Sequence, residues 1–585
     1  KKSSLKYSIL ISFSLLCSFL IHPYMGMIGS GFIALCFVGK MIWEYKQIKK
    51  MILPLLIQCA LPVGLFFCLV KLSDTHLNRP LEPYGFLVYD ASPQSVLISY
   101  AGLSNKLASY IKSIPQPNWE GIAYIGITTI LAFMFLPVYM MKHWDRFKNT
   151  FSSKPNHRTL VIMLCASLVL LILSTGYPFK WNLQHLLDSI SIIKQFRAIG
   201  RFAWMFYFIS TICATVLISE YYRGLIAGTK AFILMFILIG LFFLEGLPYH
   251  FISPKEFFPK NPFKKELVDK DLNEVIDHIK PDFAQGIIPL PFYHEGTDFF
   301  VIPGTVKSRN AGYISAYHSR TPVMANVTCR TGMLESENLI SILGSELHEK
   351  KIRKDLSSDK PFYVLWTKES LRPEEENLFA KADPVFENSS YVLKLISKEE
   401  LLADLRKQKL DYFHANKSSL PKKGDFYLSD STNYFTLQTF DSLPGKIFKG
   451  EVSENNVVLN VPANKLIKDK IYELSFHYIT ANEKGIDNDL IIIQRLNDRD
   501  SVILKQNVRE MTNIKMPEII GLVHFKALNP SASYIIKFKG GLFNPDLFSL
   551  DNVMLRDKEL DVYQETPSSK GKARTLMVNN FEIPF

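Results

Sequence analysis

Long apolar runs separated by short basic segments dominate the first 250 residues, and this pattern constrains the fold more than any other feature. A helix that crosses a bilayer core about 30 Å thick needs roughly 20 apolar residues. The overall composition, 48% hydrophobic and 21% charged, is ordinary for a soluble protein, but its uneven distribution excludes a disordered chain and a wholly soluble enzyme. Seven stretches are long and apolar enough to be membrane helices, at about 7–22, 25–43, 51–71, 120–141, 159–176, 202–221 and 230–247.

The basic residues between the apolar runs predict how these helices are oriented. Segments 1–6 and 46–50 each carry three lysines, one before the first run and one after the second. Cationic loops stay in the cytoplasm, so the first two runs form a hairpin with both ends inside. The 142–158 loop is also strongly basic, whereas the longer 72–119 loop carries few cations and is expected outside. If successive helices cross the membrane in opposite directions, everything after the seventh run lies on the exported side.

The charge balance and the cysteines exclude several other classes. Lys and Arg total 67 against 55 Asp and Glu, a formal net charge of +12. Much of this surplus lies in the loops that set topology, and no zinc-finger spacing or basic helix stripe accompanies it, so we expect no nucleic-acid partner. Of the seven cysteines only Cys329 lies outside the apolar runs, so we expect neither a zinc site nor a disulfide in the second half. The absence of an initiator Met and of a signal peptide suggests a fragment.

Beyond residue 250, polar and apolar residues alternate as they do in soluble proteins. Alternating strand and helix patterns predict an α/β domain over 251–400, and a charged linker follows at 401–424. Short, regularly spaced strands over 425–560 predict a β-sandwich, and the tail, 561–585, either adds a last strand or docks on a partner. The predicted fold is therefore an all-α membrane bundle of about seven transmembrane helices over 1–250, followed by an exported α/β domain and a C-terminal β-sandwich. Within the α/β domain we expect strands at 286–292, 361–367 and 391–396, and helices near 263–280, 334–350 and 369–381.

Arg197 and Arg201 are the most informative charged residues. They stand four apart in the segment SIIKQFRAIGRFAWMFYF (191–208), at the predicted exported end of the sixth apolar run. That spacing predicts that both lie on one helix face. Two guanidinium groups in this place could bind the phosphate of a lipid-linked sugar, each charge-assisted bond contributing about 1.5–3 kcal/mol. The alternative is that both are interfacial anchors that meet lipid head groups.

Carboxylates are the other candidates for chemistry. Asp74, Glu82 and Asp90 belong to the 72–119 loop, where one of them could act as a general base toward an acceptor hydroxyl. Glu245 lies well inside an apolar run, which marks it as a functional group or as one half of an ion pair, with Arg201 as the expected partner. The sequence names no cofactor and predicts no metal ligands, and a divalent cation stays an open alternative.

The 191–208 segment and HPYMGM at 22–27 resemble bacterial polytopic membrane proteins of the C-type glycosyltransferase superfamily, whose late helices open with a similar Arg-x-x-x-Arg-Phe pattern. The resemblance implies an enzyme of the bacterial inner (cytoplasmic) membrane. It would transfer a sugar from a polyprenyl-phosphate-linked donor, on the exported face, to a glycan or envelope protein, with membrane lipid as a further partner. The superfamily places a key acidic residue in its first exported loop. That loop here, HPYMGM, has no carboxylate, so catalysis itself stays open.

The predicted β-sandwich carries a second resemblance. Its stretches YELSFHY and FSLDNVMLRD are similar to strands of galactose-binding-like and carbohydrate-binding jelly rolls. The resemblance implies that sugars stack on exposed aromatic rings, which makes Tyr478 and His477 candidates, although core packing explains both equally well. Two other functions therefore stay open beside glycosyl transfer. One is a non-catalytic envelope membrane subunit that displays the sandwich to glycans or proteins, and the other is a transporter of a lipid-linked glycan.

Overall fold

The chain divides into two compact units in its computed structural model, and each is described by itself. The first comprises Lys1–Thr75 and Pro83–Pro259, and we call it the helical unit. The second comprises His76–Glu82 and Lys260–Phe585, and we call it the C-terminal unit. The structure describes residues 5–75, 85–99, 118–142, 144, 155–181, 183, 185–189, 196–225, 229–257, 261–296, 299–328, 331–440, 446–449, 456–480, 486, 488–540, 547–567 and 574–585.

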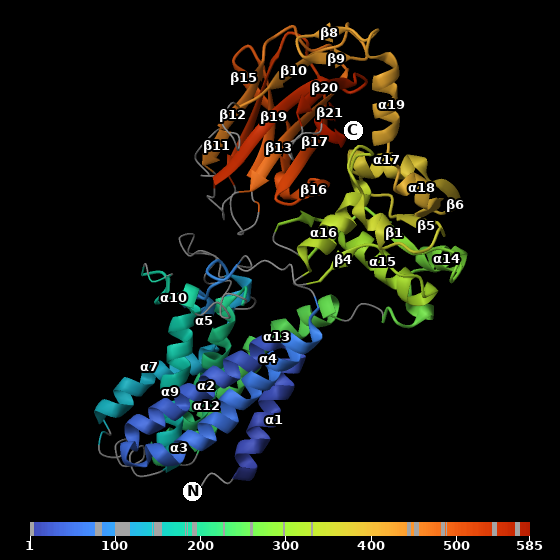
Figure 1. The fold of residues 1–585 in the computed structure, drawn as a ribbon. Coiled ribbons are helices and arrows are strands. Elements are labelled where there is room, and N and C mark those ends of the chain that lie inside the picture. Colours follow the sequence, from blue (N-terminus) through green and yellow to red (C-terminus); the bar gives the residue numbers. More distant parts are fainter. Residues whose placement is uncertain are drawn as a thin grey trace. The chain divides into compact units, whose positions relative to one another are not determined.

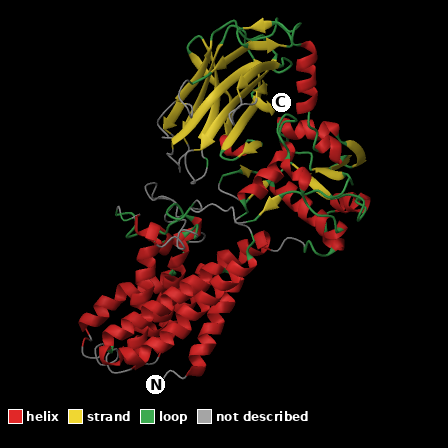
Figure 2. Ribbon diagram, viewed as in Figure 1, coloured by secondary structure: helices red, strands yellow, loops and turns green. Residues whose placement is uncertain are grey.

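Helices fill the helical unit, and their positions follow the apolar runs (Figures 1 and 2). The chain turns at His22 between the first two helices, because Pro23 cannot continue the ladder of α1 but suits the first position of α2. The long helices are α1 (Leu5–Ile21), α2 (Pro23–Trp43), α3 (Ile48–Leu55) continued by α4 (Leu61–Ser73), α7 (Ile127–Lys142), α9 (Pro155–Ser174), α12 (Trp204–Leu225) and α13 (Thr229–Phe257).

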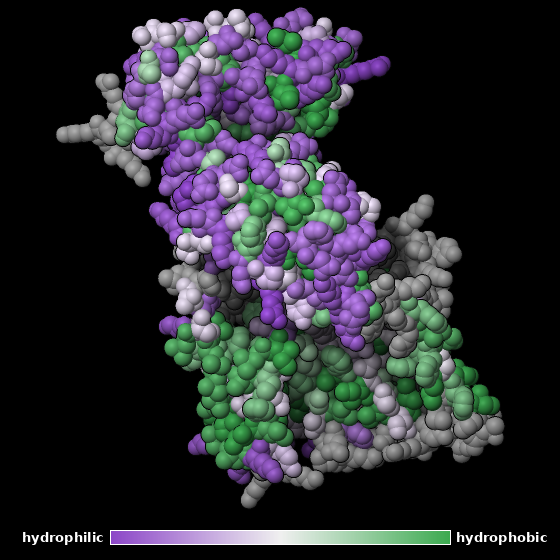
Figure 3. Space-filling view, turned by 90° about the vertical axis from the view of Figure 1, so that its right-hand side faces the viewer, coloured by the Kyte–Doolittle hydropathy of each residue, from purple (hydrophilic) through white to green (hydrophobic). Residues whose placement is uncertain are grey.

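The apolar helices make this unit a candidate for membrane insertion. Among the described residues, four helical segments are long and apolar enough to cross a bilayer. They are Pro23–Trp43, Tyr45–Ser73, His157–Ser174 and Ile199–Ser219, and Leu5–Ile21, Ile127–Val138 and Phe236–Pro248 are shorter apolar helices. Large apolar side chains face outward: Phe242, Phe243 and Leu244 of α13 are 67, 66 and 68% exposed. Apolar residues also cover much of the visible face of this unit in Figure 3. The helical N-terminal region is confirmed, and seven crossings stay a prediction.

Four segments gather at one end of the helical unit, which we call the loop end. They are residues 85–99, 118–126, 175–181 and 196–203. Backbone bonds join them: the Ala91 N–H donates to Ser174 O at the end of α9 (2.8 Å), and the Ala123 N–H donates to Ser95 O (2.9 Å). The start of α2 belongs to the same end, because the hydroxyl of Tyr24 accepts from the Ala198 N–H (2.9 Å).

The C-terminal unit begins with an α/β layer around a four-stranded sheet. The strand order is β1-β5-β7-β6, with β1 parallel to β5 and the other pairs antiparallel. The three strands predicted from the sequence are confirmed, whereas the helix expected at 334–350 ends at Ile340 and gives way to a 3-10 turn. The elements are β1 (Gly286–Leu290), β5 (Phe362–Trp366), β6 (Asp383–Glu387), β7 (Val392–Ile396), α14 (Lys270–His278), α15 (Val306–Ser319), α16 (Met333–Ile340) and α17 (Pro373–Lys381).

Two sheets form the β-sandwich that follows (Figure 2). Side chains alternate between core and surface along each strand, as in Ser533–Gly540, where every second residue is buried. In the core, the Phe476 ring lies over Gly521 of the neighbouring strand, and a Cβ at Gly521 would stand 2.0 Å from Phe476 Cζ. One sheet has the order β10-β19-β13-β17-β16 and the other β12-β18-β14-β15, from β10 (Phe435–Gln438), β12 (Asn456–Val461), β13 (Ile471–Thr480), β14 (Asn488–Leu496), β15 (Arg499–Asn507), β16 (Asn513–Lys515), β17 (Glu518–Lys526), β18 (Ser533–Gly540) and β19 (Leu547–Asp557), with β11 (Lys446–Lys449) beside β19.

A third sheet answers the question that the sequence left open about residues 561–585. They supply three strands, so the tail adds strands rather than only docking a partner. The order is β22-β21-β20-β9-β8, and Phe413 of helix α19 (Arg406–Asn416) packs with Tyr563 and Leu576 in its core. The strands are β8 (Lys422–Lys423), β9 (Phe426–Leu428), β20 (Val562–Pro567), β21 (Arg574–Val578) and β22 (Phe581–Pro584).

Candidate functional site

Three backbone segments of the helical unit cross at the loop end with almost no space between them. A Cβ on Gly121 would stand 2.6 Å from the carbonyl oxygen of Asp90, and one on Gly200 would stand 2.8 Å from Gly121 Cα. The Gly200 N–H also donates to Tyr89 O (2.8 Å). Only glycine permits such an approach. The crossing therefore brings the neighbours of these glycines, Glu120 and Arg201, to the same place as Asp90.

Arg201 and Glu120 form a bidentate ion pair at this crossing. The Nη2 of Arg201 donates to Oε1 of Glu120 (2.7 Å), and its Nε donates to Oε2. The Arg201 guanidinium also lies over the ring of Tyr24, with 4.4 Å between Cζ and the ring centroid. Their side chains are only 20 and 10% exposed, so the pair is weakly screened and fixes the position of both charges. The sequence analysis missed Glu120, and a carboxylate directly before an apolar run is the signal that could have found it.

Asp90 and Lys180 form a second ion pair beside the first. Their side chains are 22 and 37% exposed, so this pair is the more accessible of the two. Asp90 is thus the predicted general base that the structure places beside Arg201. The Lys180 ammonium is the ion-pair partner of this carboxylate.

The expectation that Arg197 and Arg201 share one helix face is wrong. Ala198 between them is extended, with φ −134° and ψ 92°, and the 3-10 helix that contains Arg201 starts only at Ile199. Arg197 therefore precedes the helix, and its half-buried side chain is not related to Arg201 by a helical turn. The two resembling segments do pack together, because Tyr24 of HPYMGM contacts Phe196 edge-on, with 4.9 Å between ring centroids.

Glu245 has partners other than the two ion pairs of this crossing. Glu245 of α13 accepts from the Ile127 N–H at the start of α7 (2.9 Å to Oε2) and from the hydroxyl of Tyr124. A carboxylate at a helix N-terminus is stabilised by the unpaired N–H groups there, so Glu245 has a structural role, and its expected pairing with Arg201 is wrong. Asp74 ends α4, and Glu82 lies outside the described residues.

A divalent cation does not fit this crossing. Within the described part of the chain, no group of three or more His, Cys, Asp or Glu side chains is arranged to hold a metal ion. Asp90 and Glu120 are the carboxylates at the crossing, and each is already matched by a cation, Lys180 and Arg201 respectively. An added cation would have to displace these partners.

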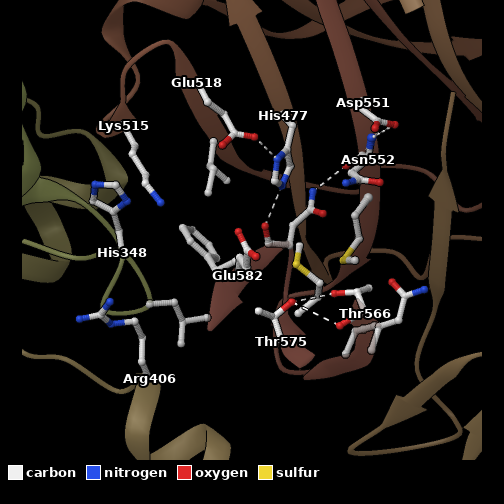
Figure 4. Close-up of a pocket in the computed structure, with 18 of the residues that line it drawn as sticks. His348, Arg406, His477, Lys515, Glu518, Asp551, Asn552, Thr566, Thr575 and Glu582 are labelled. Atoms are coloured by element: carbon white, nitrogen blue, oxygen red, sulfur yellow. Dashed lines mark hydrogen bonds and ion pairs between the residues drawn. The ribbon is translucent and has the colours of Figure 1, made fainter. Parts of the chain in front are cut away.

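The C-terminal unit contains a pocket of about 860 Å³ on the outer face of the β13 sheet (Figure 4). The third sheet and the 347–351 segment of the α/β layer complete its walls. The side chains of Ile520, Met554 and Phe581 are apolar parts of the lining. Its polar lining residues are His348, Glu349, Lys351, Arg406, Thr439, His477, Lys515, Glu518, Asp551, Asn552, Gln564, Thr566, Thr575, Asn580 and Glu582.

His477 joins two walls of this pocket. Its Nδ1 lies 2.5 Å from Oε1 of Glu518 on β17, and its Nε2 lies 2.8 Å from the carbonyl oxygen of Asn580, before β22. Both neighbours accept, so both ring nitrogens must carry hydrogen and the ring is an imidazolium. Burial alone would lower the pKa of His477, but the hydrogen bond to Glu518 and the charge of Glu518 outweigh it and raise that pKa. The hydrogen bond from His477 in turn lowers the pKa of Glu518.

Tyr478 is a core residue. It is 3% exposed and stacks on Phe548, with 5.4 Å between ring centroids, so it cannot offer a face to a sugar. The core-packing alternative therefore holds for Tyr478, whereas His477, which points to the opposite face of the strand, lines the pocket.

Comparisons with known proteins find one family model and several solved structures, and none of them shows an activity for this chain. A family model described as a domain of unknown function (DUF6311) matches residues 2–244. No curated protein matches the chain. Among the solved structures that match is the carbohydrate-binding and catalytic module pair of a Clostridium thermocellum endo-1,4-β-D-xylanase in complex with xylohexaose. It shares 14% identity over 23% of this chain and 26% of its own, with a TM-score of 0.15. This chain thus spans about a quarter of that structure.

A second match is the C-terminal carbohydrate-binding module of LamC from Zobellia galactanivorans. It shares 11% identity over 21% of this chain and all of its own, with a TM-score of 0.14. A structure titled as a family 4 carbohydrate-binding module shares 13% identity over 21% of this chain and 95% of its own, also with a TM-score of 0.14. These matches contain carbohydrate-binding modules, and the described part of the C-terminal unit of this chain is rich in β-strands.

Proposed function

We propose that this chain is a multi-pass protein of the bacterial inner membrane that transfers a sugar from a polyprenyl-phosphate-linked donor on the exported face. The observation that carries the proposal is the meeting of Asp90, Lys180, Glu120 and Arg201 at one end of an apolar helical unit. Charged groups that gather where apolar helices end are well placed for a ligand with a charged head and an apolar tail.

The topology that we propose follows from the same helices. Seven crossings and cytoplasmic basic loops would direct the loop end outward. The helices α1, α4, α9 and α13 then run toward that end, so the chain enters the C-terminal unit from the exported side. Access of a protease or a thiol reagent to the C-terminal unit from outside intact cells tests this orientation.

The chemistry that we propose has one bond formed and one broken. An acceptor hydroxyl attacks the anomeric carbon while the bond from that carbon to the phosphate oxygen breaks, and the polyprenyl phosphate leaves with the electron pair. Asp90 takes the hydroxyl proton as general base. Arg197 and Lys180 stabilise the departing phosphate charge. When the Lys180 ammonium turns toward the phosphate, it leaves its ion pair with Asp90, and the carboxylate is then free to accept the proton. The Arg201–Glu120 pair is a positioning element, because its charges satisfy each other.

Binding of undecaprenyl phosphate to the full chain in detergent, measured by native mass spectrometry, tests the proposal. We expect Arg197→Ala combined with Arg201→Ala to weaken binding by at least about tenfold, since one lost charge-assisted bond corresponds to that factor or more. Arg201→Lys with Arg197 intact shows whether the bidentate geometry matters. Lys49→Ala, in the first turn of α3 at the end predicted to be cytoplasmic, is the matched control. Unchanged binding in the double variant would remove the phosphate site.

A second function is compatible with the same crossing, namely a non-catalytic envelope subunit that displays the sandwich to glycans or proteins. Both carboxylates at the crossing are ion-paired, which suits a structural cluster as well as an active one. Asp90→Asn separates the two functions. An enzyme loses transfer and keeps lipid binding in this variant, whereas a subunit keeps all of its binding and shows no transfer in either form.

A further inference from the structure

The pocket of the C-terminal unit has walls of two different kinds, and this difference indicates its ligand. On one side lie the 347–351 segment, Arg406 and the short strand β16. On the other side lie β19, β20, β21 and β22. Figure 4 shows Lys515 and Arg406 on the first side, and Asn552, Thr566, Thr575 and Glu582 across the cavity from them.

The first wall carries three cationic side chains, Lys351, Arg406 and Lys515, together with the carboxylate of Glu349. Lys515 is exposed, its ammonium points into the cavity in Figure 4, and no carboxylate of a described residue lies within ion-pair distance of it. His348 lies at this wall. Burial lowers its pKa to about 4, the bond with Ile514 opposes that shift, and the charges of Lys351, Lys350 and Lys515 add to it. His348 is therefore neutral here.

Lys515 is the lysine of this wall that is left to meet a ligand. The ammonium of Lys351 is bound to Glu337 at 2.6 Å. The guanidinium of Arg406 donates to both oxygens of Asp404, at 2.9 and 2.7 Å. Both cations still contribute long-range potential, but each already has a carboxylate partner within the protein.

The second wall offers neutral hydrogen-bonding groups above an apolar floor. The hydroxyls of Thr566 and Thr575 lie 3.0 Å apart, and each keeps capacity to donate or accept. Asn552 and Gln564 add amide groups, and Asp551 and Glu582 add acceptors. A ligand that satisfies these groups must itself carry several donors and acceptors.

We propose that this pocket binds an acidic saccharide, with its carboxylate or phosphate on Lys515 and its hydroxyls on the β19–β21 wall. The apolar floor of Ile520, Met554 and Phe581 suits the carbon-bound hydrogens of a sugar ring. Among the lining residues that the structure describes, the aromatic rings are those of Phe426 and Phe581 rather than of Trp or Tyr. This site is independent of the membrane site, and its failure would leave the proposed transfer untouched.

Calorimetric titration of the full chain in detergent tests the anionic requirement. Trigalacturonate is the probe, and its methyl ester is the matched neutral ligand with the same sugar skeleton. We expect the acid to bind at least about tenfold more tightly than the ester, since a single charge-assisted contact distinguishes them. Glucose 1-phosphate in a third titration distinguishes a phosphate from a carboxylate as the preferred anion.

Variants then locate the site. Lys515→Glu should remove at least about tenfold of the affinity for the acid and leave the affinity for the ester unchanged, while Lys515→Arg retains binding. Because Lys515 is exposed, both variants should fold, and an unchanged unfolding temperature checks this. Lys468→Ala, an exposed lysine before β13, is the control. Equal binding of acid and ester, full binding by Lys515→Glu, or no binding of any of the three ligands would overturn the proposal.

Discussion

The His477 imidazolium should make the hairpin β21–β22 sensitive to pH. The ring donates from one nitrogen to Glu518 and from the other to the carbonyl of Asn580, and only the protonated form can do both. Deprotonation of the His477 ring removes one N–H group. The ring then loses its hydrogen bond either to Glu518 on β17 or to the Asn580 carbonyl in the hairpin. Asp551 on β19 and Lys515 on β16 are the other charged groups that act on this pair, the first raising the pKa of His477 and the second lowering that of Glu518.

The direction of each pKa shift sets the pH window. The pKa of His477 is raised, so its contribution is complete below the unfolded value, near 6.5, and is lost as pH rises through the folded pKa. The pKa of Glu518 is lowered, so its contribution is present above the unfolded value, near 4.5, and is lost as pH falls through the folded pKa. The pair therefore stabilises most between about pH 4.5 and 6.5.

The magnitude follows from the exposure of the two side chains. His477 is 12% exposed and Glu518 is 34% exposed, so solvent partly screens the charges. We therefore take the lower end of the range for bonds to charged groups, about 1.5 kcal/mol, which corresponds to roughly a tenfold change in an opening equilibrium.

Hydrogen–deuterium exchange of peptides that cover residues 574–584, in the full chain, measures that equilibrium. At pH 6, His477→Gln should exchange about tenfold faster than the wild type, and the difference should shrink toward pH 9. Comparison at equal pH cancels the intrinsic pH dependence of exchange. His278→Gln, at an exposed site in the α/β layer, is the control. A ratio near one at pH 6, or a ratio that stays constant from pH 5 to 9, would refute the reasoning.

Two further predictions concern stability. Glu473→Ala should destabilise the sandwich by about 3–5 kcal/mol, because it leaves Arg556, whose side chain is 6% exposed, as a buried charge without its carboxylate partner at 2.5 Å. Calorimetric unfolding measures this, with Glu559→Ala at an exposed site as the control; a loss under 1 kcal/mol would contradict it. Gly200→Ala should lower the unfolding temperature of the detergent-solubilised chain, because its Cβ would stand 2.8 Å from backbone atoms of Gly121 and Tyr89. Gly240→Ala, which has no atom within 4 Å of its Cβ, should not, and equal effects would argue against the crossing.

The sequence predicted the helical unit well, because the length of an apolar run depends on local composition alone. It failed where tertiary contacts set the backbone. The four-residue spacing of Arg197 and Arg201 indicates a shared helix face, but the close approach at Gly200 leaves the preceding Ala198 extended. A contact between segments that are distant in the chain leaves no periodic pattern in the amino-acid sequence of either segment.

Helix α15 shows a second limit. Its buried residues are small or polar, namely Ser308, Ala311, Gly312, Ser315 and Ser319, so no apolar stripe of helical period marks it. The pocket was beyond sequence reasoning for a similar reason. His348, His477 and Glu582 come from segments more than 100 residues apart, and only the folded sheets bring them together.

The order of the pocket walls along the chain has a consequence for synthesis. The two-sheet sandwich closes with β19, but one wall of the cavity, β20–β22, is translated only afterwards. A nascent chain that has emerged as far as residue 560 would hold its sandwich with Ile520 and Met554 still uncovered. Until the final hairpin leaves the ribosome, this apolar floor would be a binding site for chaperones rather than for a ligand.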